Sequence, residues 1–459
     1  MLRNLTASLL QWFDGPQRLP LVLRGARQVG KTWLVRDLAA QRNRDLVELN
    51  FERDPRLQRV FTSNDPHRMV ADLGIALGRD VAPDRSLLFL DEIQAAPPVL
   101  NRLRWFAEEM PELPVVAAGS LLEFALTDAA VRSPVGRVTF RHVEPMDFSE
   151  FLLAHGQDPL LERLRAWYPG EAITDVVHER ARSWYERFAM VGGMPAVVTA
   201  DVERADAARC RRLQADLITA YRDDFARYTG RLDRAILDRV LLATADQLGA
   251  KFVYARVGEG VKQHQAKNAL ELLAKARLVT LVAHATGTAP PLGGSVHARN
   301  RKAILLDVGL AHALLATPGG AVPPRWDQLA DAVRGKLSAQ LAGQQLRALD
   351  PAEGGEPGLY YWQRGAGRAG EIDFLIQPGH LVVPVELKSG KAGSLKSLHL
   401  FVHESGLGLA MRVDANPPSL QELDVKTTLG DQARYRILNL PGYLLWRCAE
   451  LLTAIGGSG

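Results

Sequence analysis

One segment of the sequence combines glycines, a lysine and a hydroxyl residue at a spacing that suits phosphate binding. Gly25 and Gly30 flank four residues, and Lys31 and Thr32 follow directly. The glycines allow tight turns in which successive backbone N–H groups converge on a triphosphate. Lys31 can then reach the β- and γ-phosphates, and the Thr32 hydroxyl can complete a Mg²⁺ shell. We therefore expect ATP or ADP with Mg²⁺ to bind through Gly25, Ala26, Arg27, Gln28, Val29, Gly30, Lys31, Thr32 and Trp33.

An acidic pair follows the apolar run of residues 86–90. Asp91, at the carboxyl end of such a strand, can hold Mg²⁺ directly or through water. The adjacent Glu92 is placed to orient and deprotonate the attacking water. A strand that simply ends in a polar turn would look similar. The phosphate-binding pattern about sixty residues upstream favours ATP hydrolysis.

A second set of possible metal ligands lies near the C-terminus, in the strand-like runs 371–376 and 381–389. If the two runs pair as a hairpin, Asp373 lies beside Glu386, and Lys388 shares a face with Glu386. Two carboxylates can hold Mg²⁺ while Lys388 stabilises a charged transition state, which is nuclease chemistry. Alternating strand residues with solvent-facing charge remain the other explanation.

The elements that must position these residues follow from the hydrophobic pattern. Between residues 19 and 150, short apolar runs alternate with helical stretches, which indicates an α/β domain with a mostly parallel sheet. The run 114–118 ends in Gly119 and Ser120, and Ser120 would face the γ-phosphate across the carboxyl edge of the sheet. A helix N-cap is an equally good local explanation for Ser120. Strands are expected at residues 21–24, 45–51, 86–90, 114–118 and 137–143.

The middle of the chain is mainly helical. Helices followed by two strand-like runs within residues 231–316 suggest a winged-helix module. Its helix starting at Lys262–Lys267 could enter a DNA groove, although a solvated helix face explains the same charges more simply. The Pro- and Gly-rich stretch Thr317–Pro324 is expected to be a linker.

Composition sets broad limits. The chain has 459 residues, enough for several domains, with 47% hydrophobic and 24% charged residues, as in a folded soluble protein. A net charge of +4 neither requires nor excludes nucleic acid as a partner. The two cysteines form no metal-ligand pattern and suit a reducing, cytoplasmic location. No apolar run approaches the about 18 residues of a membrane span.

Together these motifs resemble a family of prokaryotic AAA-like P-loop ATPases that carry a C-terminal restriction-endonuclease-like domain. The resemblance covers nearly the whole chain. It implies an AAA-like ATPase domain at 1–150, a helical lid or linker at 151–230, a winged-helix-like domain at 231–316 and a restriction-endonuclease-like α/β domain at 325–459. The matching segments are Gly25–Thr32, Leu88–Gln94, Ala118–Ser120, Pro134–Arg137, Gly192–Pro195, Leu306–Gly309, Ile372–Phe374 and Pro384–Gly390.

The resemblance also implies roles for single residues. Ser120 would act as the sensor of the γ-phosphate. Arg137 would stabilise the transferring charge in its own or a neighbouring subunit's site, which favours a homo-oligomer, either a ring or a dimer. A surface arginine at a strand start is the alternative. Two positions depart from the family: Ala26 stands where proline is usual, and the helix after Gly335 lacks the usual carboxylate.

These observations predict an ATP-binding and ATP-hydrolysing protein whose nucleotide state is coupled to binding of nucleic acid, above all DNA, or of another partner. The missing carboxylate weakens the Mg²⁺ site of the C-terminal domain. Two other functions therefore stay open. One is a slow nucleotide-dependent regulatory switch with a catalytically silent nuclease-like domain. The other is an active ATP-dependent DNA nuclease.

Overall fold

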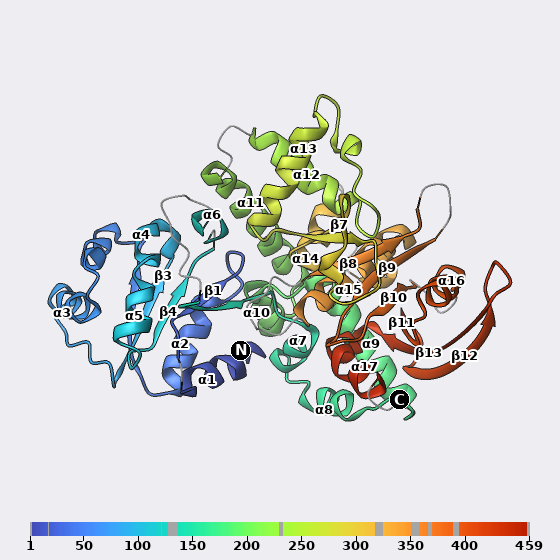
Figure 1. Cartoon of the computed structure of the whole chain (residues 1–459), viewed down its shortest axis with the longest axis horizontal. Helices are drawn as coiled ribbons and strands as arrows, with labels where there is room; N and C mark the ends of the chain where they lie inside the picture. Colours follow the sequence, from blue (N-terminus) through green and yellow to red (C-terminus); the bar gives the residue numbers. More distant parts are fainter. Residues whose placement is uncertain are drawn as a thin grey trace. The chain divides into compact units, whose positions relative to one another are not determined.

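The structure is a computed structural model that describes residues 2–16, 18–120, 122–126, 136–228, 233–316, 325–349, 358–365, 370–388 and 394–456. The chain divides into two compact units (Figure 1). Unit 1 comprises Met1–Pro145, Lys275–Leu278 and Pro351–Glu356. Unit 2 comprises Met146–Ala274, Val279–Asp350 and Pro357–Gly459. Among the helices that the structure describes, none combines the length and the hydropathy that a membrane span requires.

Unit 1 is built on a five-stranded sheet with the order β2-β3-β4-β1-β5. All of its strand pairs are parallel, which confirms the α/β sheet expected for this part of the chain. Its inner strand β3 is buried at every position, as a strand covered on both faces must be. The strands are β1 (Leu21–Arg24), β2 (Asp45–Asn50), β3 (Ser86–Asp91), β4 (Val115–Ala118) and β5 (Thr139–His142).

Short helices connect these strands. The side chain of Asp65 caps α3 by accepting hydrogen bonds from the N–H groups of His67 and Arg68, and Gly78 ends α3 in the left-handed conformation. Aromatic side chains such as Phe51, Phe61 and Phe106 belong to the core of this unit. The helices are α1 (Leu5–Asp14), α2 (Lys31–Gln41), η1 (Pro55–Thr62), α3 (Pro66–Leu77), η2 (Ile93–Ala95), α4 (Pro97–Leu100), α5 (Leu103–Glu109) and α6 (Leu122–Leu126).

Unit 2 begins with a run of helices. Its helices up to the first strand are α7 (Phe148–Ala154), α8 (Asp158–Ala166), α9 (Asp175–Val191), α10 (Pro195–Arg204), α11 (Ala207–Tyr228), α12 (Arg234–Asp246), η3 (Tyr254–Val257) and α13 (Gln263–Lys275). Later helices are η4 (Leu292–Gly294), α14 (Val308–Leu315), η5 (Trp326–Gln328), α15 (Asp331–Ala348), α16 (Lys396–Ser405), η6 (Gly442–Arg447) and α17 (Cys448–Gly456). The expected linker, residues 317–324, lies outside the described residues.

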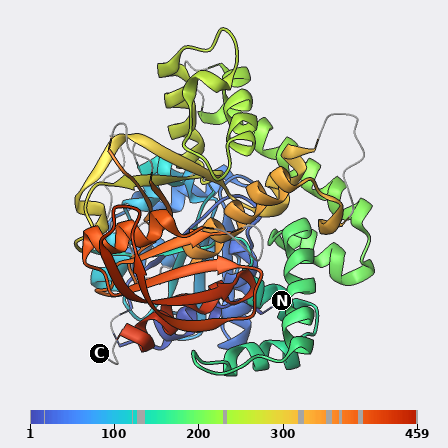
Figure 2. The same ribbon diagram turned by 90° about the vertical axis from the view of Figure 1, so that its right-hand side faces the viewer.

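An eight-stranded sheet organises unit 2, with the order β12-β13-β11-β10-β9-β8-β6-β7; its orange and red strands can be followed in Figure 2. Strands β10, β11 and β13 run parallel to one another. The strands are β6 (Val279–Ala285), β7 (Val296–Leu305), β8 (Leu359–Gln363), β9 (Glu371–Ile376), β10 (Val383–Leu387), β11 (Leu409–Asp414), β12 (Ser419–Lys426) and β13 (Gln432–Pro441).

The hairpin of β6 and β7, expected as the wing of a winged-helix module, belongs to this same sheet. Strand β6 pairs with β7 on one side and with β8 on the other. An isolated hairpin is only marginally stable in water, and the added pairing gives it a covered edge. The winged-helix interpretation stays a prediction.

Two short motifs of the sequence meet at a buried carboxylate. Asp307 is fully buried and accepts hydrogen bonds from the N–H groups of Gly193 at 2.7 Å and Gly309 at 2.9 Å. The Gln344 amide donates a third bond at 3.1 Å. A Cβ atom on Gly193 would lie 2.0 Å from the Met146 carbonyl oxygen. A Cβ atom would lie 2.1 Å from Asp307 Oδ1 on Gly192 and 2.3 Å from the Val191 carbonyl oxygen on Gly309, so close packing accounts for the glycines in both motifs.

Candidate functional site

The glycine-rich loop connects β1 to α2 through an unusual backbone path. Gly25, Gln28 and Gly30 have φ angles of 149°, 63° and 99°. A Cβ atom on Gly25 would lie 2.3 Å from the Val143 carbonyl oxygen, so only glycine fits there. Alternation of left- and right-handed residues produces concave groups of backbone N–H donors that bind anions. No side chain caps the N-terminus of α2, which leaves its first N–H groups for a ligand.

Lys31, the first residue of α2, folds back on the loop. Its Nζ atom donates to the carbonyl oxygens of Gly25 at 3.0 Å and Ala26 at 2.7 Å. Burial lowers the pKa of Lys31 to about 8, although the charges of Glu92 and Asp91 act in the opposite direction. The ammonium group therefore lies beside the loop and donates hydrogen bonds to neutral carbonyl oxygens. A phosphate oxygen, which is charged, would be a stronger hydrogen-bond acceptor.

Asp91 and Thr32 meet where a magnesium ion is expected. The Thr32 hydroxyl donates to Asp91 Oδ2 at 3.3 Å, and the Asn50 amide donates to the same oxygen at 3.3 Å. Burial, followed by the charge of Glu92, raises the pKa of Asp91. A buried carboxylate beside a hydroxyl fits a divalent cation, whose charge would favour the ionised form. Sequence reasoning gave Asn50 no role, although it ends the neighbouring strand β2.

Glu92 is held in a defined position by Gln94. Glu92 has a left-handed backbone with φ of 51°, and its Oε2 atom accepts a 2.6 Å hydrogen bond from the Gln94 amide. A Cβ atom on Gly119 would lie 2.3 Å from Gln94 Oε1. Gly119 therefore makes room for the residue that orients Glu92. In the sequence analysis, Gln94 belongs to the matching segment Leu88–Gln94, but it is not assigned the role of orienting Glu92.

Ser120 contacts the loop directly. It is buried, and its hydroxyl accepts a hydrogen bond from Arg27 Nε at 3.2 Å. Arg27 also pairs with Glu52 at 3.1 Å. A conformational change of the phosphate-binding loop can therefore be transmitted to Ser120 through the side chain of Arg27. The N-cap alternative involves Leu121, which lies outside the described residues.

Arg137 lies just before β5 with its side chain half exposed. Its Nε atom pairs with Glu108 of α5 at 2.6 Å, and this hydrogen bond lowers the pKa of Glu108. The pair matches the alternative of a surface arginine at a strand start, and the catalytic role of Arg137 stays a prediction. Residues 134 and 135 of the same motif lie outside the described part of the chain.

Sequence reasoning missed Arg3, which precedes α1. The guanidinium group is buried and donates to the carbonyl oxygens of Val29 at 2.9 Å and Glu144 at 2.6 Å. Val29 belongs to the phosphate-binding loop, so Arg3 supports the loop from behind. The amphipathic pattern of the first residues predicts a helix there but gives no signal for this contact.

The C-terminal carboxylates lie on neighbouring strands, as the hairpin hypothesis requires. Strands β9 and β10 are antiparallel. Asp373 Oδ2 accepts a hydrogen bond from the Leu387 N–H at 2.9 Å, and Lys388 Nζ donates to Glu386 Oε1 at 2.7 Å. Burial, followed by the charge of Asp373, raises the pKa of Glu386.

A lysine that the sequence analysis did not consider completes this cluster. Lys302 of β7 places its Nζ atom 2.5 Å from Glu371 Oε1 and 3.6 Å from Asp373 Oδ1. Gly335 lies inside α15; the residues of α15 that follow it supply no carboxylate, and Gln340 binds the backbone of Leu305. Among the described residues, no group of three or more His, Cys, Asp or Glu could hold a metal ion. The carboxylates of the cluster are engaged in ion pairs with Lys302 and Lys388, and their role as Mg²⁺ ligands stays a prediction.

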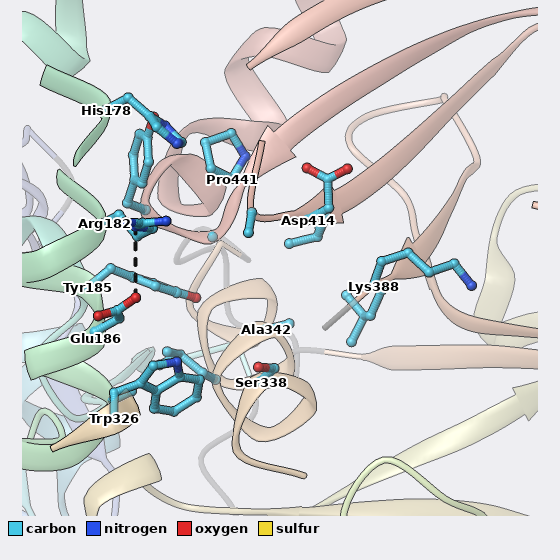
Figure 3. Close-up of a pocket in the computed structure, with 17 residues that line it drawn as sticks. His178, Arg182, Tyr185, Glu186, Trp326, Ser338, Ala342, Lys388, Asp414 and Pro441 are labelled. Carbon is cyan, nitrogen blue, oxygen red and sulfur yellow. Dashed lines mark hydrogen bonds and ion pairs between the residues drawn. The ribbon is translucent and has the colours of Figure 1, made fainter. Parts of the chain in front are cut away.

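A cavity of about 120 Å³ lies in unit 2 at the carboxyl ends of β10, β11 and β13. Figure 3 shows Tyr185 and Trp326 on its walls, whereas the side chain of Lys388 leads away from it. Arg182 and Glu186 on its wall lie 3.9 Å apart as an ion pair. Lys388 contributes to the lining of the cavity, but its Nζ atom donates to Glu386.

Comparison with known families matches three parts of the chain. A family described as AAA domain matches residues 17–152. A Domain of unknown function (DUF8612) matches residues 182–319, and another (DUF4143) matches residues 334–411. A search of the curated proteins found no match. With the loop geometry above, the first match identifies the N-terminal part as an AAA-like P-loop ATPase domain.

Several solved structures are similar to parts of the chain. The Walker-type ATPase PABY2304 of Pyrococcus abyssi is 18% identical, with a TM-score of 0.41, over 67% of this chain and 94% of that one. The Aeropyrum pernix ORC1 protein in complex with DNA is 15% identical, with a TM-score of 0.25, over 68% and 90%. AMPPCP-bound DnaA from Aquifex aeolicus is 11% identical, with a TM-score of 0.26, over 59% and 88%.

Proposed function

We propose that the AAA-like P-loop ATPase domain binds ATP with Mg²⁺ and hydrolyses it, and that the nucleotide state controls binding of DNA or another partner by the rest of the chain. The convergence of Lys31, Thr32, Asp91 and Glu92 is the observation that carries this proposal. Lys31 and Thr32 begin α2, whereas Asp91 ends β3 and Glu92 follows it. Strand β3 belongs to the parallel sheet of unit 1. Ligands of such sheets bind at the carboxyl ends of the strands.

Each residue has a distinct task in this proposal. Lys31 and the N–H groups of residues 25–33 bind the phosphates, and Thr32 and Asp91 hold Mg²⁺. When bound, Mg²⁺ neutralises the charge that develops on the phosphate oxygens. Glu92, oriented by Gln94, accepts the proton of the attacking water.

The remaining roles concern how the nucleotide state is read. Ser120 senses the γ-phosphate through its bond with Arg27. Arg137 acts in its own subunit or in a neighbouring one, which would require a ring or a dimer. Its ion pair with Glu108 would have to break first.

For the rest of the chain we propose the domains expected from the sequence: a helical lid or linker at 151–230, a winged-helix-like domain at 231–316 and a restriction-endonuclease-like domain at 325–459. The last proposal is supported by the order α15-β8-β9-β10-α16-β11, with β9 antiparallel and β11 parallel to β10. In the winged-helix proposal, α13 is the element that approaches DNA.

A specific observation favours one of the alternatives for the C-terminal part. The carboxylates of the nuclease-like cluster are paired with Lys302 and Lys388. A slow regulatory switch with a catalytically silent nuclease-like domain is therefore the second candidate function. An active ATP-dependent DNA nuclease would need Asp373 and Glu386 free to bind Mg²⁺, with Lys388 beside them.

Two substitutions test the ATPase proposal. Lys31→Ala should abolish binding of a fluorescent ATP analogue. Glu92→Gln should retain binding but slow phosphate release by about 10²–10⁴-fold, the usual contribution of a general base. The matched control is Lys336→Ala, which removes a partly exposed lysine paired with Asp246. Turnover that survives both active-site substitutions would rule out the proposal.

Addition of DNA separates the two candidate functions. A machine coupled to DNA should hydrolyse ATP faster when DNA is present. A switch should turn over slowly and at the same rate in both conditions. Plasmid incubated with Mg²⁺ or Mn²⁺ tests cleavage, with Asp373→Ala as the control. Equal amounts of intact plasmid for wild type and variant would exclude the nuclease.

A further inference from the structure

The ammonium group of Lys302 lies among carboxylates in the interior of unit 2. The residue is only 4% exposed. Its Nζ atom contacts Glu371 and Asp373 of β9 and lies 5.0 Å from the centre of the Tyr361 ring. A buried ammonium group is strongly disfavoured unless anionic partners surround it. Lys302 is therefore committed to the two carboxylates of β9.

The second lysine of the cluster is committed as well. Lys388 Nζ lies 2.7 Å from Glu386 Oε1. Three carboxylates, Glu371, Asp373 and Glu386, thus face two ammonium groups. The remaining oxygen of Asp373, Oδ2, accepts the N–H of Leu387. The two ammonium groups offset two of the three negative charges, which weakens the attraction for a divalent cation. Glu386 Oε2 is buried without a hydrogen-bond partner, so it is the carboxylate oxygen that the lysines leave available.

We propose that Lys302 is a built-in cation that takes the place of a divalent metal at Glu371 and Asp373. The cluster is then a metal-free ion-pair centre that ties β7 to β9 across the two intervening strands β6 and β8. This goes beyond the proposed ATPase function, because it concerns residues of unit 2 alone. It also adds a side-chain link between the hairpin of β6 and β7 and the strand that carries Glu371 and Asp373.

The decisive variant is Lys302→Met, which keeps a long apolar side chain and removes the charge. The cluster then holds three carboxylates and one lysine, and we expect it to gain a site for one Mn²⁺. Loss of a neighbouring positive charge should tighten Mn²⁺ binding by at least about tenfold. Titration of nucleotide-free full-length protein, followed by the electron paramagnetic resonance signal of free Mn²⁺, measures this directly. All proteins in this titration also carry Asp91→Asn. This substitution removes the acidic metal ligand of the ATP site, so that Mn²⁺ binding there does not contribute to the signal.

Three further proteins make the result interpretable. Lys302→Arg keeps the charge and should gain no Mn²⁺ site. Adding Asp373→Asn to Lys302→Met should abolish the gained site. Adding Asp373→Asn to the protein with native Lys302 should leave its Mn²⁺ titration unchanged. Circular dichroism melts establish which variants are folded.

Two outcomes would overturn the proposal. One is that folded Lys302→Met gains no Mn²⁺ site. The other is that protein with native Lys302 binds Mn²⁺ at a site that Asp373→Asn removes, a result that does not depend on whether Lys302→Met folds. Either outcome leaves the ATPase proposal untouched, because ATP turnover is measured separately through Lys31 and Glu92.

Discussion

Raising the pH from 7.5 to 9 should weaken ATP binding, because Lys31 loses its proton in the nucleotide-free protein over this range. Burial lowers the pKa of Lys31 to about 8, and its present partners are two neutral carbonyl groups. Phosphates favour the charged form, so the pKa of Lys31 must be higher in the complex than in the free protein. Above the lower of these two pKa values, binding takes up a proton, and affinity falls as pH rises.

The size of the effect follows from the same pKa. With a pKa of about 8, about three quarters of the free protein carries the proton on Lys31 at pH 7.5, but only about one molecule in eleven at pH 9. The dissociation constant should therefore rise about eightfold, or about 1.3 kcal/mol, if the complex stays protonated. Calorimetry with a non-hydrolysable ATP analogue and Mg²⁺ measures it. Buffers of different ionisation enthalpy should reveal uptake of nearly one proton at pH 9.

The control is Lys31→Arg, because a guanidinium group stays protonated across this range. Whatever affinity this variant retains should no longer fall between pH 7.5 and pH 9. Amine labelling of the nucleotide-free protein gives an independent measurement, and the modification of Lys31 should have its midpoint near pH 8. An analogue affinity that is equal at both pH values, with no proton uptake, would refute the reasoning.

Two further substitutions test supporting contacts. Arg3→Ala removes charged hydrogen bonds to the carbonyl oxygens of Val29 in the loop and of Glu144, each worth about 1.5–3 kcal/mol. It should lower both the melting temperature and the ATP affinity, and a variant unchanged in both would contradict the bracing role. Gly193→Ala should destabilise unit 2 by more than about 2 kcal/mol in urea unfolding, because its Cβ would overlap the Met146 carbonyl. The matched control, Gly335→Ala, lies within a helix with open space around it and should stabilise slightly, so equal effects would disprove the packing argument.

The local pattern of the ATP site could be read from the sequence because its chemistry depends on consecutive residues. Lys31 and Thr32 follow the glycines directly, and the apolar runs of β1 and β3 mark buried parallel strands. Antiparallel pairing of β9 and β10 was likewise implied by two adjacent strand-like runs. In these cases a short window contains all the information that the geometry needs.

Contacts between distant residues could not be predicted in this way. Arg3 reaches Val29 and Glu144 from a position whose neighbours indicate only a helix. Lys302 reaches Asp373 across intervening strands. The residue pattern within β7 or β9 does not indicate the order of the strands in the sheet. One sequence does not reveal which strands become neighbours when the chain between them is long.

The pairing of β6 with β8 bears on how this chain can be divided for experiments. A fragment starting at residue 325 would contain the C-terminal carboxylates but would lose β6, whose residues Val282 to His284 lie opposite Leu359 to Tyr361 of β8. Strand β8 would then present a bare row of backbone donors and acceptors to solvent, a template on which other chains assemble. Truncations made at the apparent linker would therefore yield aggregating material, and a cut before α12 would keep the edge protected.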